Sequence, residues 1–187
     1  MTVPNEVYRP KQFQLSGLKG ISDKTLEMHF GLYEGYVNET NLLTERLAEL
    51  DRDGKAAKNS AYAEMKRHLS YEYGGMILHE YHFDNLAPKG KGKPSSELTQ
   101  AFEQSFGGLG AGRDDFVATG GMRGVGWAVV FRDPATGRLS NQWITLHEQG
   151  APAGFAPILV MDAWALFANV NWQEVGERLL RASRTAK

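Results

Sequence analysis

The chain has 187 residues, a formal net charge of −1 at pH 7, 42% hydrophobic residues and 23% charged residues, which is ordinary for a soluble globular protein and argues against a nucleic-acid-binding surface. The absence of cysteine excludes disulfides, thiolate catalysis and zinc sites built from cysteine. No apolar run reaches the ~18 residues that span a bilayer and the N-terminus lacks the apolar core of a signal peptide, so we expect a cytoplasmic protein that binds no membrane.

Two long helices are predicted in the N-terminal part of the chain. Ser22 and Asp23 make a good helix start, with Ser as the N-cap and Asp in the first turn, where the helix dipole favours an anion. Apolar residues then recur at helical spacing over residues 22–50, and a second helix is predicted over residues 60–83. The short connection between them predicts an antiparallel hairpin, and we assign residues 1–88 to this helical lobe.

Residues 95–187 are predicted to form a second lobe. A basic segment rich in Gly and Pro, residues 88–94, reads as a solvated linker between the two lobes. A short amphipathic helix is predicted over residues 96–106. The Gly-rich run that follows, residues 107–112, is not a dinucleotide-binding fingerprint, because no strand precedes it.

Three strands and a closing helix complete the second lobe. Strands are predicted over residues 126–131 and 138–146, joined by a turn at residues 133–137, and over residues 156–162. The closing helix is predicted over residues 173–182. The predicted fold class is therefore α+β: an N-terminal antiparallel helical hairpin, followed by a C-terminal α/β lobe with a small three-stranded antiparallel sheet.

Three residues form a candidate metal-binding set. His29 and His79 lie on the two predicted helices, and Asp162 ends the third predicted strand. Two imidazoles and one carboxylate suit iron or manganese, and facing helices that each offer an inward histidine are a common way to build a metal site. The alternative is that each histidine is an ordinary core or surface residue.

Five motifs, spread over about residues 20–180, carry a resemblance to a known family. The longer two are MHFGLYEGYVN at residues 28–38 and LHEYHFDNLAP at residues 78–88. The other three follow in order: GVGW at 124–127, DAW at 162–164 and NVNW at 169–172. Together they resemble the iron/manganese superoxide dismutase family. The resemblance implies an iron or manganese cofactor, no organic cofactor, and superoxide as a small-molecule substrate that is converted to dioxygen and hydrogen peroxide.

The resemblance also implies a role for particular residues. His29 is expected as the axial metal ligand, with His79 and Asp162 as two equatorial ligands. Tyr36 is expected as the tyrosine beside the metal at the substrate funnel. The spacing from His29 to Tyr36 is seven residues, one fewer than is usual in the family. Because one helical residue is a rotation of ~100°, either a local bulge is absent or Tyr36 points elsewhere.

The family holds its metal-bound solvent with a polar side chain from the second helix or from the sheet. At the second-helix position this chain has Gly75, which has no side chain. The predicted partner is therefore His147 or Gln149 in the loop after the second strand, with His147 preferred. A hydrogen-bond donor at this place adjusts the solvent pKa and the metal potential.

The sequence departs from the family after Trp164. Two residues later, where the family has its fourth protein ligand, this chain has Leu166, and it then passes almost at once to the NVNW motif. A segment of more than a dozen residues is missing by comparison, together with the Glu that crosses the family's dimer interface. We therefore expect a homodimer that is weaker than in complete relatives.

Three interpretations follow from the missing ligand. The chain is a working dismutase in which water, His82 or His147 fills the vacant position. Alternatively it is a degenerate relative without turnover, with a structural or binding role. In the third interpretation, the two histidines and the aspartate form an open triad of the kind that supports oxygen activation at iron.

Overall fold

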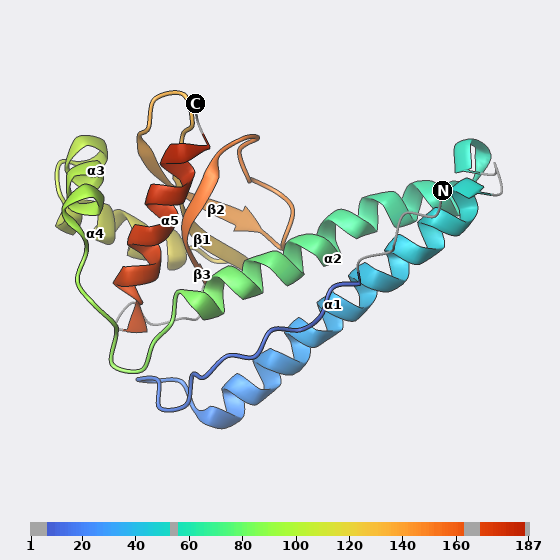
Figure 1. The fold of residues 1–187 in the computed structure, drawn as a ribbon, viewed down its shortest axis with the longest axis horizontal. Helices are drawn as coiled ribbons and strands as arrows, with labels where there is room; N and C mark the ends of the chain where they lie inside the picture. The colour runs from blue at the N-terminus through green and yellow to red at the C-terminus, as the bar shows by residue number, and fades with distance from the viewer. Residues whose placement is uncertain (1–6, 53–55, 163–168, 186–187) are drawn as a thin grey trace.

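The computed structural model describes residues 7–52, 56–162 and 169–185 (Figure 1). Its elements, in chain order, are α1 (Asp23–Arg52), a short 3-10 helix (Ala56–Lys58), α2 (Ser60–Asp84), α3 (Ser96–Phe106), α4 (Leu109–Gly120), β1 (Gly126–Arg132), β2 (Leu139–Thr145), β3 (Ala156–Asp162) and α5 (Trp172–Arg184). The predicted α+β class is confirmed. In the described part of the chain, no helix is long and apolar enough to cross a membrane.

The helices α1 and α2 form the predicted antiparallel hairpin, which extends far beyond the rest of the molecule (Figure 1). The Ser22 hydroxyl accepts a hydrogen bond from the Thr25 N–H at 3.1 Å, so Ser22 caps α1 as its sequence suggests. Asn59 caps α2 by accepting from the Ala61 N–H at 2.9 Å. The N-terminal segment runs alongside α1, where it buries Leu15 within the core.

The sheet has three antiparallel strands, as predicted, and their order is β2-β1-β3. The central strand β1 is buried along nearly its whole length, because it has a strand on each side and helices over its faces. Trp127 near the start of β1 pairs in register with Ile144 of β2 and with Asp162 of β3. The register therefore places the predicted carboxylate ligand beside a buried tryptophan.

Hydrogen bonds fix the end of β3 against the C-terminal half of α2. The side-chain oxygen of Asn85 accepts from the Val160 N–H at 2.9 Å and from the buried Arg178 guanidinium at 2.9 Å. Arg178 also donates to the Tyr81 carbonyl at 3.3 Å. Because Arg178 belongs to α5, three elements are joined at one point, two residues before Asp162 on β3.

The helix α4 was not predicted, because its first turns contain the Gly-rich run. Gly112 is needed in this helix for packing: a Cβ atom there would lie 2.5 Å from the Phe102 ring of α3. The glycine lets α3 and α4 approach closely, and together they cover the sheet from one side. The boundary between the two lobes at residues 88–94 remains a prediction.

Candidate metal centre

The structure places His29 next to each of the other two predicted ligands, where the hairpin meets the sheet. The rings of His29 on α1 and His79 on α2 meet edge to face, with centroids 4.8 Å apart. The His29 Nε2 atom lies 3.7 Å from the Asp162 Oδ2 atom at the end of β3. His29 and Asp162, more than 130 positions apart, thus line one pocket, with His79 in contact with His29.

His79 is held in the form that a metal ion binds. Its Nδ1 atom lies 2.6 Å from the Gly75 carbonyl oxygen, which can only accept a hydrogen bond, so the proton is on Nδ1 and Nε2 keeps its lone pair. Burial lowers the pKa of His79 to about 3, against the opposing effect of the Gly75 hydrogen bond. The imidazole is therefore neutral at pH 7 and ready to coordinate through Nε2.

His29 and Asp162 form the second part of the centre. Burial lowers the pKa of His29, and the nearby Asp162 carboxylate acts in the opposite direction. The backbone of Asp162 is anchored separately, since its N–H donates to the His82 Nδ1 atom at 3.3 Å. Both partners are partly accessible, with 20% and 24% of their side chains exposed, so the centre opens to solvent on this side.

A cavity of about 390 Å³ lies at this opening. His29, His82 and Asp162 form its ionisable side. The remaining lining comes from α1 and from a residue two positions before it: Ile21, Thr25, Met28 and Leu32. His82 is 2% exposed and its ring lies 5.5 Å from that of His29. Burial, followed by the charges of His29 and His79, lowers the pKa of His82 well below its ordinary value, so this third imidazole is also neutral.

The donor set fits iron or manganese in its chemistry, because neutral imidazole and carboxylate are the ligands that these metals accept. The candidate ligands are spaced more widely than side chains that already surround one ion. Among residues 7–52, 56–162 and 169–185, no three His, Asp or Glu side chains are arranged so that they could hold one ion together. Small shifts of the side chains are needed to bring the set around a metal. Trp164 and Leu166 lie outside the described residues.

A second set of hydrogen bonds lies next to His79. The Trp127 indole N–H donates to the His147 Nδ1 atom at 3.0 Å. Since Nδ1 accepts, the proton of this imidazole is on Nε2, which donates to the Tyr36 hydroxyl oxygen at 2.8 Å. Burial lowers the pKa of His147 to about 4, so the ring is neutral and its tautomer is fixed by these two partners.

Tyr36 reaches this place although its spacing from His29 is short. Helix α1 is continuous over both residues, and the Tyr36 ring lies 5.1 Å from the His79 ring. Room for it is made by Gly75, where a Cβ atom would lie 2.6 Å from the Tyr36 ring. The neighbouring Gly74 accommodates the loop after β2, since a Cβ atom there would meet the His147 carbonyl oxygen at 2.3 Å.

Of the two predicted loop candidates, the structure places only His147 at the centre. The side chain of Gln149 is exposed, and its backbone carbonyl accepts a hydrogen bond from the Thr145 N–H at 2.7 Å. This bond closes the loop and holds His147 inward. His68, which shares a face of α2 with His79 in the sequence pattern, lies farther out and pairs with Glu72 at 2.8 Å.

Comparison with known proteins decides the family. The model for the C-terminal domain of iron/manganese superoxide dismutases matches residues 94–166. An iron superoxide dismutase of Aquifex aeolicus is 34% identical over 188 residues, covering 89% of this chain and 88% of the relative. A manganese superoxide dismutase of Haloferax volcanii is 31% identical over 180 residues, covering 87% and 88%. The chain belongs to the iron/manganese superoxide dismutase family.

Sequence reasoning missed two features of this family member. Tyr71 contacts both Tyr36 and His147, with ring centroids 6.0 Å and 4.7 Å away, but a tyrosine on a helix carries no signal of its own. The pair Gly74-Gly75 was noted only as a missing side chain. Two glycines inside a strongly predicted helix are a recognisable sign of close approach by another part of the chain.

Proposed function

We propose that this chain is a superoxide dismutase-type metalloprotein that converts superoxide to dioxygen and hydrogen peroxide with iron or manganese. One observation supports the proposal: in a member of this family, the His29 ring on α1 lies 4.8 Å from the His79 ring on α2, and the His29 Nε2 atom lies 3.7 Å from the Asp162 Oδ2 atom on β3. The relatives are named for iron in some cases and manganese in others, and imidazole with carboxylate suits both.

In this proposal His29, His79 and Asp162 hold the metal. Bound iron or manganese supplies the one-electron oxidation and reduction that superoxide requires. The hydrogen bond from His79 to the Gly75 carbonyl orients the ring and makes Nε2 more basic, which strengthens its binding to a metal. The buried surroundings of His79 keep water from competing for the same nitrogen.

Tyr36 and His147 handle protons in the proposed reaction. Reduction of superoxide to hydrogen peroxide consumes two protons, and the ring of Tyr36, which carries a hydroxyl, packs 5.1 Å from the His79 ring. The His147 Nε2–H donates to the Tyr36 oxygen and so sets the direction of its own O–H. Trp127 fixes the His147 ring, which makes this arrangement rigid before substrate arrives.

A homodimer, weaker than in complete relatives, and a cytoplasmic location are part of the proposal. The weaker dimer rests on the sequence, in which the family's interface segment after Trp164 is shortened. Sedimentation at nanomolar concentration measures the first, and a tight dimer there would count against it.

A family member without turnover is the second candidate. The observation that favours it is the open spacing of the centre, in which no three His, Asp or Glu side chains of the described residues could hold one ion without moving. Losing one of four protein ligands weakens metal binding, so a protein with this scaffold can serve as a structural or binding protein instead.

A superoxide-consumption assay on protein loaded with iron or with manganese separates the two candidates. The proposal expects metal-dependent consumption that is lost in His79→Ala together with the bound metal. Metal that stays bound in stoichiometric amount after this substitution would refute the proposed ligand set. Metal-loaded wild-type protein that leaves superoxide decay unchanged would favour the member without turnover.

A further inference from the structure

Leu146, which directly precedes His147 in the loop after β2, has a backbone conformation that leucine rarely adopts. Its φ angle is 56°, in the left-handed region, where Lys89 is the only other residue of the described chain that is not glycine. The Cβ atom of leucine meets a steric penalty in this region, which glycine avoids and asparagine tolerates better. A strained residue beside a functional group indicates a constraint that the surrounding structure enforces.

Backbone hydrogen bonds hold Leu146 in this conformation. The Leu146 N–H donates to the Val125 carbonyl oxygen at 2.9 Å, which ties the loop to the residue before β1. Thr145 and Gln149 share two backbone hydrogen bonds, at 2.7 Å and 3.3 Å, and so close a loop of three residues with His147 in the middle. A change of Leu146 to an ordinary φ would therefore disturb a closed, hydrogen-bonded loop.

The place of the left-handed residue within this loop is unusual. In the common hairpin loop of three residues, a type I turn comes first and the last residue is left-handed. Here the first residue, Leu146, is left-handed, and the last, Glu148, is not. The chain thus turns before His147 instead of after it, which changes the direction in which the His147 side chain leaves the loop.

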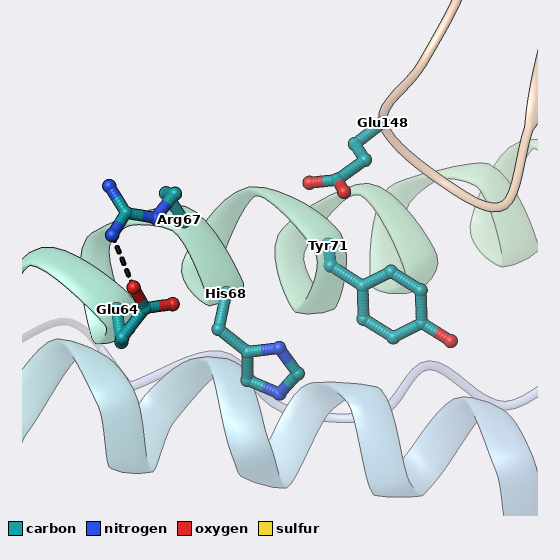
Figure 2. A pocket seen from close by; sticks show the side chains of 5 residues that line it. All are labelled: Glu64, Arg67, His68, Tyr71 and Glu148. Carbon is teal, nitrogen blue, oxygen red and sulfur yellow. Dashed lines mark hydrogen bonds and ion pairs between the residues drawn. The ribbon is translucent and has the colours of Figure 1, made fainter.

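His147 and Glu148 leave the loop in different directions. The His147 ring packs against Tyr36 and Trp127, with ring centroids 4.8 Å and 5.8 Å away. Glu148 is exposed and reaches toward α2, where it lines a second cavity of about 300 Å³ (Figure 2). The other residues of this cavity all belong to α2: Glu64, Arg67, His68 and Tyr71. A carboxylate turned inward in place of the imidazole would have no N–H to donate to Tyr36.

We propose that Leu146 is a positioning residue, whose left-handed backbone turns His147 toward Tyr36 and Trp127. Leu146 acts through the two hydrogen bonds of the His147 ring, which accepts from the Trp127 N–H at 3.0 Å and donates to the Tyr36 oxygen at 2.8 Å. The proposal rests on the proposed function, because that function assigns proton handling to Tyr36 and His147.

Substitutions at Leu146 separate its backbone conformation from the packing of its side chain. Leu146→Gly removes the side chain and adopts the left-handed conformation freely. Leu146→Val keeps an apolar side chain, but its branched Cβ makes the left-handed conformation more costly. The proposal expects the arrangement of His147 to survive in Leu146→Gly and to be lost in Leu146→Val. A packing role predicts the reverse order.

NMR of metal-free protein with ¹⁵N-labelled histidine measures this arrangement. In wild type the His147 ring should show one tautomer, with a proton on Nε2 that exchanges slowly with solvent because it is bonded to Tyr36. We expect Leu146→Val to mix the tautomers and to speed this exchange at least ~10-fold, the size of effect that a disfavoured backbone conformation has. Leu146→Gly should stay near the wild-type rate. Equal exchange in the two variants, or faster exchange in Leu146→Gly, would overturn the proposal.

Leu146→Asn keeps the test decisive even if Leu146→Val does not fold. Asparagine tolerates the left-handed region, and both Leu146→Asn and Leu146→Gly lose the apolar side chain. The proposal expects the wild-type tautomer and exchange rate of His147 in both. Faster exchange in both would show that packing of the leucine side chain holds the loop, and would overturn the proposal.

Lys89→Val is the matched control for strain as such. Lys89 has a φ of 64° and is exposed in the segment between α2 and α3, so this substitution adds the same kind of backbone strain in another part of the chain. The tautomer and exchange rate of His147 should equal those of wild type. Exchange as fast as in Leu146→Val would show that a general loss of stability causes the effect, and would contradict a specific role of Leu146.

The metal-free measurement separates this proposal from the proposed function. If metal-loaded wild type consumes superoxide while Leu146→Gly loses the His147 arrangement, the positioning role is wrong and the function stands. If the variants follow the expected order but no superoxide is consumed, the positioning role stands and the function fails. In an active protein, Leu146→Val should lower kcat by about 10-fold with the metal retained, as expected for the loss of a supporting group.

Discussion

The two halves of helix α2 place the same residue type in opposite surroundings. In the inner half His79 is 3% exposed and neutral, with its Nδ1 proton given to a backbone carbonyl and its Nε2 lone pair left for a metal. In the outer half His68 is largely exposed and bonded to Glu72. The comparison shows that burial and the partner on the second nitrogen decide what a histidine does, rather than its place on a helical face.

Gly74 and Gly75 mark the boundary between the two halves. They let the His147 loop and the Tyr36 ring press against α2, and these two groups shield the inner half from solvent. The tyrosine that follows His68 by three residues, Tyr71, lies on the outer side of this boundary and lines the cavity. The same short segment therefore lies between the buried His79 and the exposed His68 with its partner Glu72.

Removing one histidine from each half gives the largest expected contrast. His79→Ala should weaken binding of iron or manganese by more than ~100-fold, since the loss of mere supporting groups already costs ~10–100-fold. His68→Ala should keep the full metal content, because His68 lies on the outer half of α2, where it pairs with Glu72. Metal analysis after gel filtration measures both. Equal metal loss in the two variants would contradict the conclusion that only the inner half of α2 contributes a metal ligand.

The boundary itself can be broken by adding one carbon. Gly75→Ala places a Cβ atom where it would lie 2.6 Å from the Tyr36 ring, so α2 and Tyr36 must separate. We expect a loss of ~3 kcal/mol in the free energy of unfolding, the upper end of the cost of overpacking. Urea unfolding of metal-free protein measures it.

Gly35→Ala is the matched control for that substitution. Gly35 lies on α1 near the same tyrosine, but a Cβ atom there would meet nothing within 4 Å. Because glycine inside a helix costs ~0.5–1 kcal/mol relative to alanine, this variant should be more stable than wild type by about that amount. A loss of stability in Gly35→Ala as large as that in Gly75→Ala would contradict the packing argument.

The buried state of His79 also predicts a pH dependence. Its pKa is about 3 in the folded protein against an ordinary 6.5, so between these values the unfolded chain takes up a proton that the folded protein does not. This proton uptake favours the unfolded chain. The folded protein therefore has its full stability above pH 6.5 and loses stability as the pH falls toward 3. At ~1.36 kcal/mol per pKa unit, His79 lowers the free energy of unfolding by ~2 kcal/mol at pH 5.

The measurement is the change in unfolding free energy between pH 7 and pH 5, in metal-free protein. Wild type should lose ~2 kcal/mol more than His79→Gln over this range, because the variant has no imidazole to protonate. The same loss in both proteins would show that His79 does not stay neutral in the folded state.

The smallest expected effect concerns the loop that reaches over the boundary. His147→Ala removes the donor to Tyr36 and the acceptor for Trp127, and we expect superoxide consumption to fall by about 10-fold with the metal retained. Gln149→Ala, two residues away and exposed, should leave the rate unchanged. A larger effect from Gln149→Ala than from His147→Ala would show that Gln149, and not His147, is the loop residue that supports the reaction.

Most of the fold could be predicted because its signals are local. The turn at residues 133–137 is an example: the Asp133 carboxylate accepts from the Ala135 N–H at 2.9 Å, and Gly137 adopts a positive φ of 74°. Local signals did not predict helix α4, because its glycines are typical of a loop. What stabilises α4 is the fit of Gly112 against Phe102, and no local pattern contains that contact.

The candidate site could be predicted in part for the same reason. Helical periodicity and the end of a buried strand indicate His29, His79 and Asp162. The choice of tautomer depends on the side-chain rotamer of His79, which places Nδ1 2.6 Å from the Gly75 carbonyl one turn earlier in α2, and the sequence pattern does not specify that rotamer. The preference for His147 over Gln149 rested on family resemblance. Its physical basis, the close approach of the loop to Gly74, appears only in three dimensions.

Pulsed EPR on Mn²⁺-loaded protein with ¹⁵N-labelled histidine tests the convergence of His29, His79 and Asp162 most directly, because it counts the imidazole nitrogens bound to the ion. Our account predicts coupling to two such nitrogens, with one lost in His29→Ala and the other in His79→Ala. Mn²⁺ that shows no coupling to histidine nitrogen, or coupling that survives both substitutions, would contradict it.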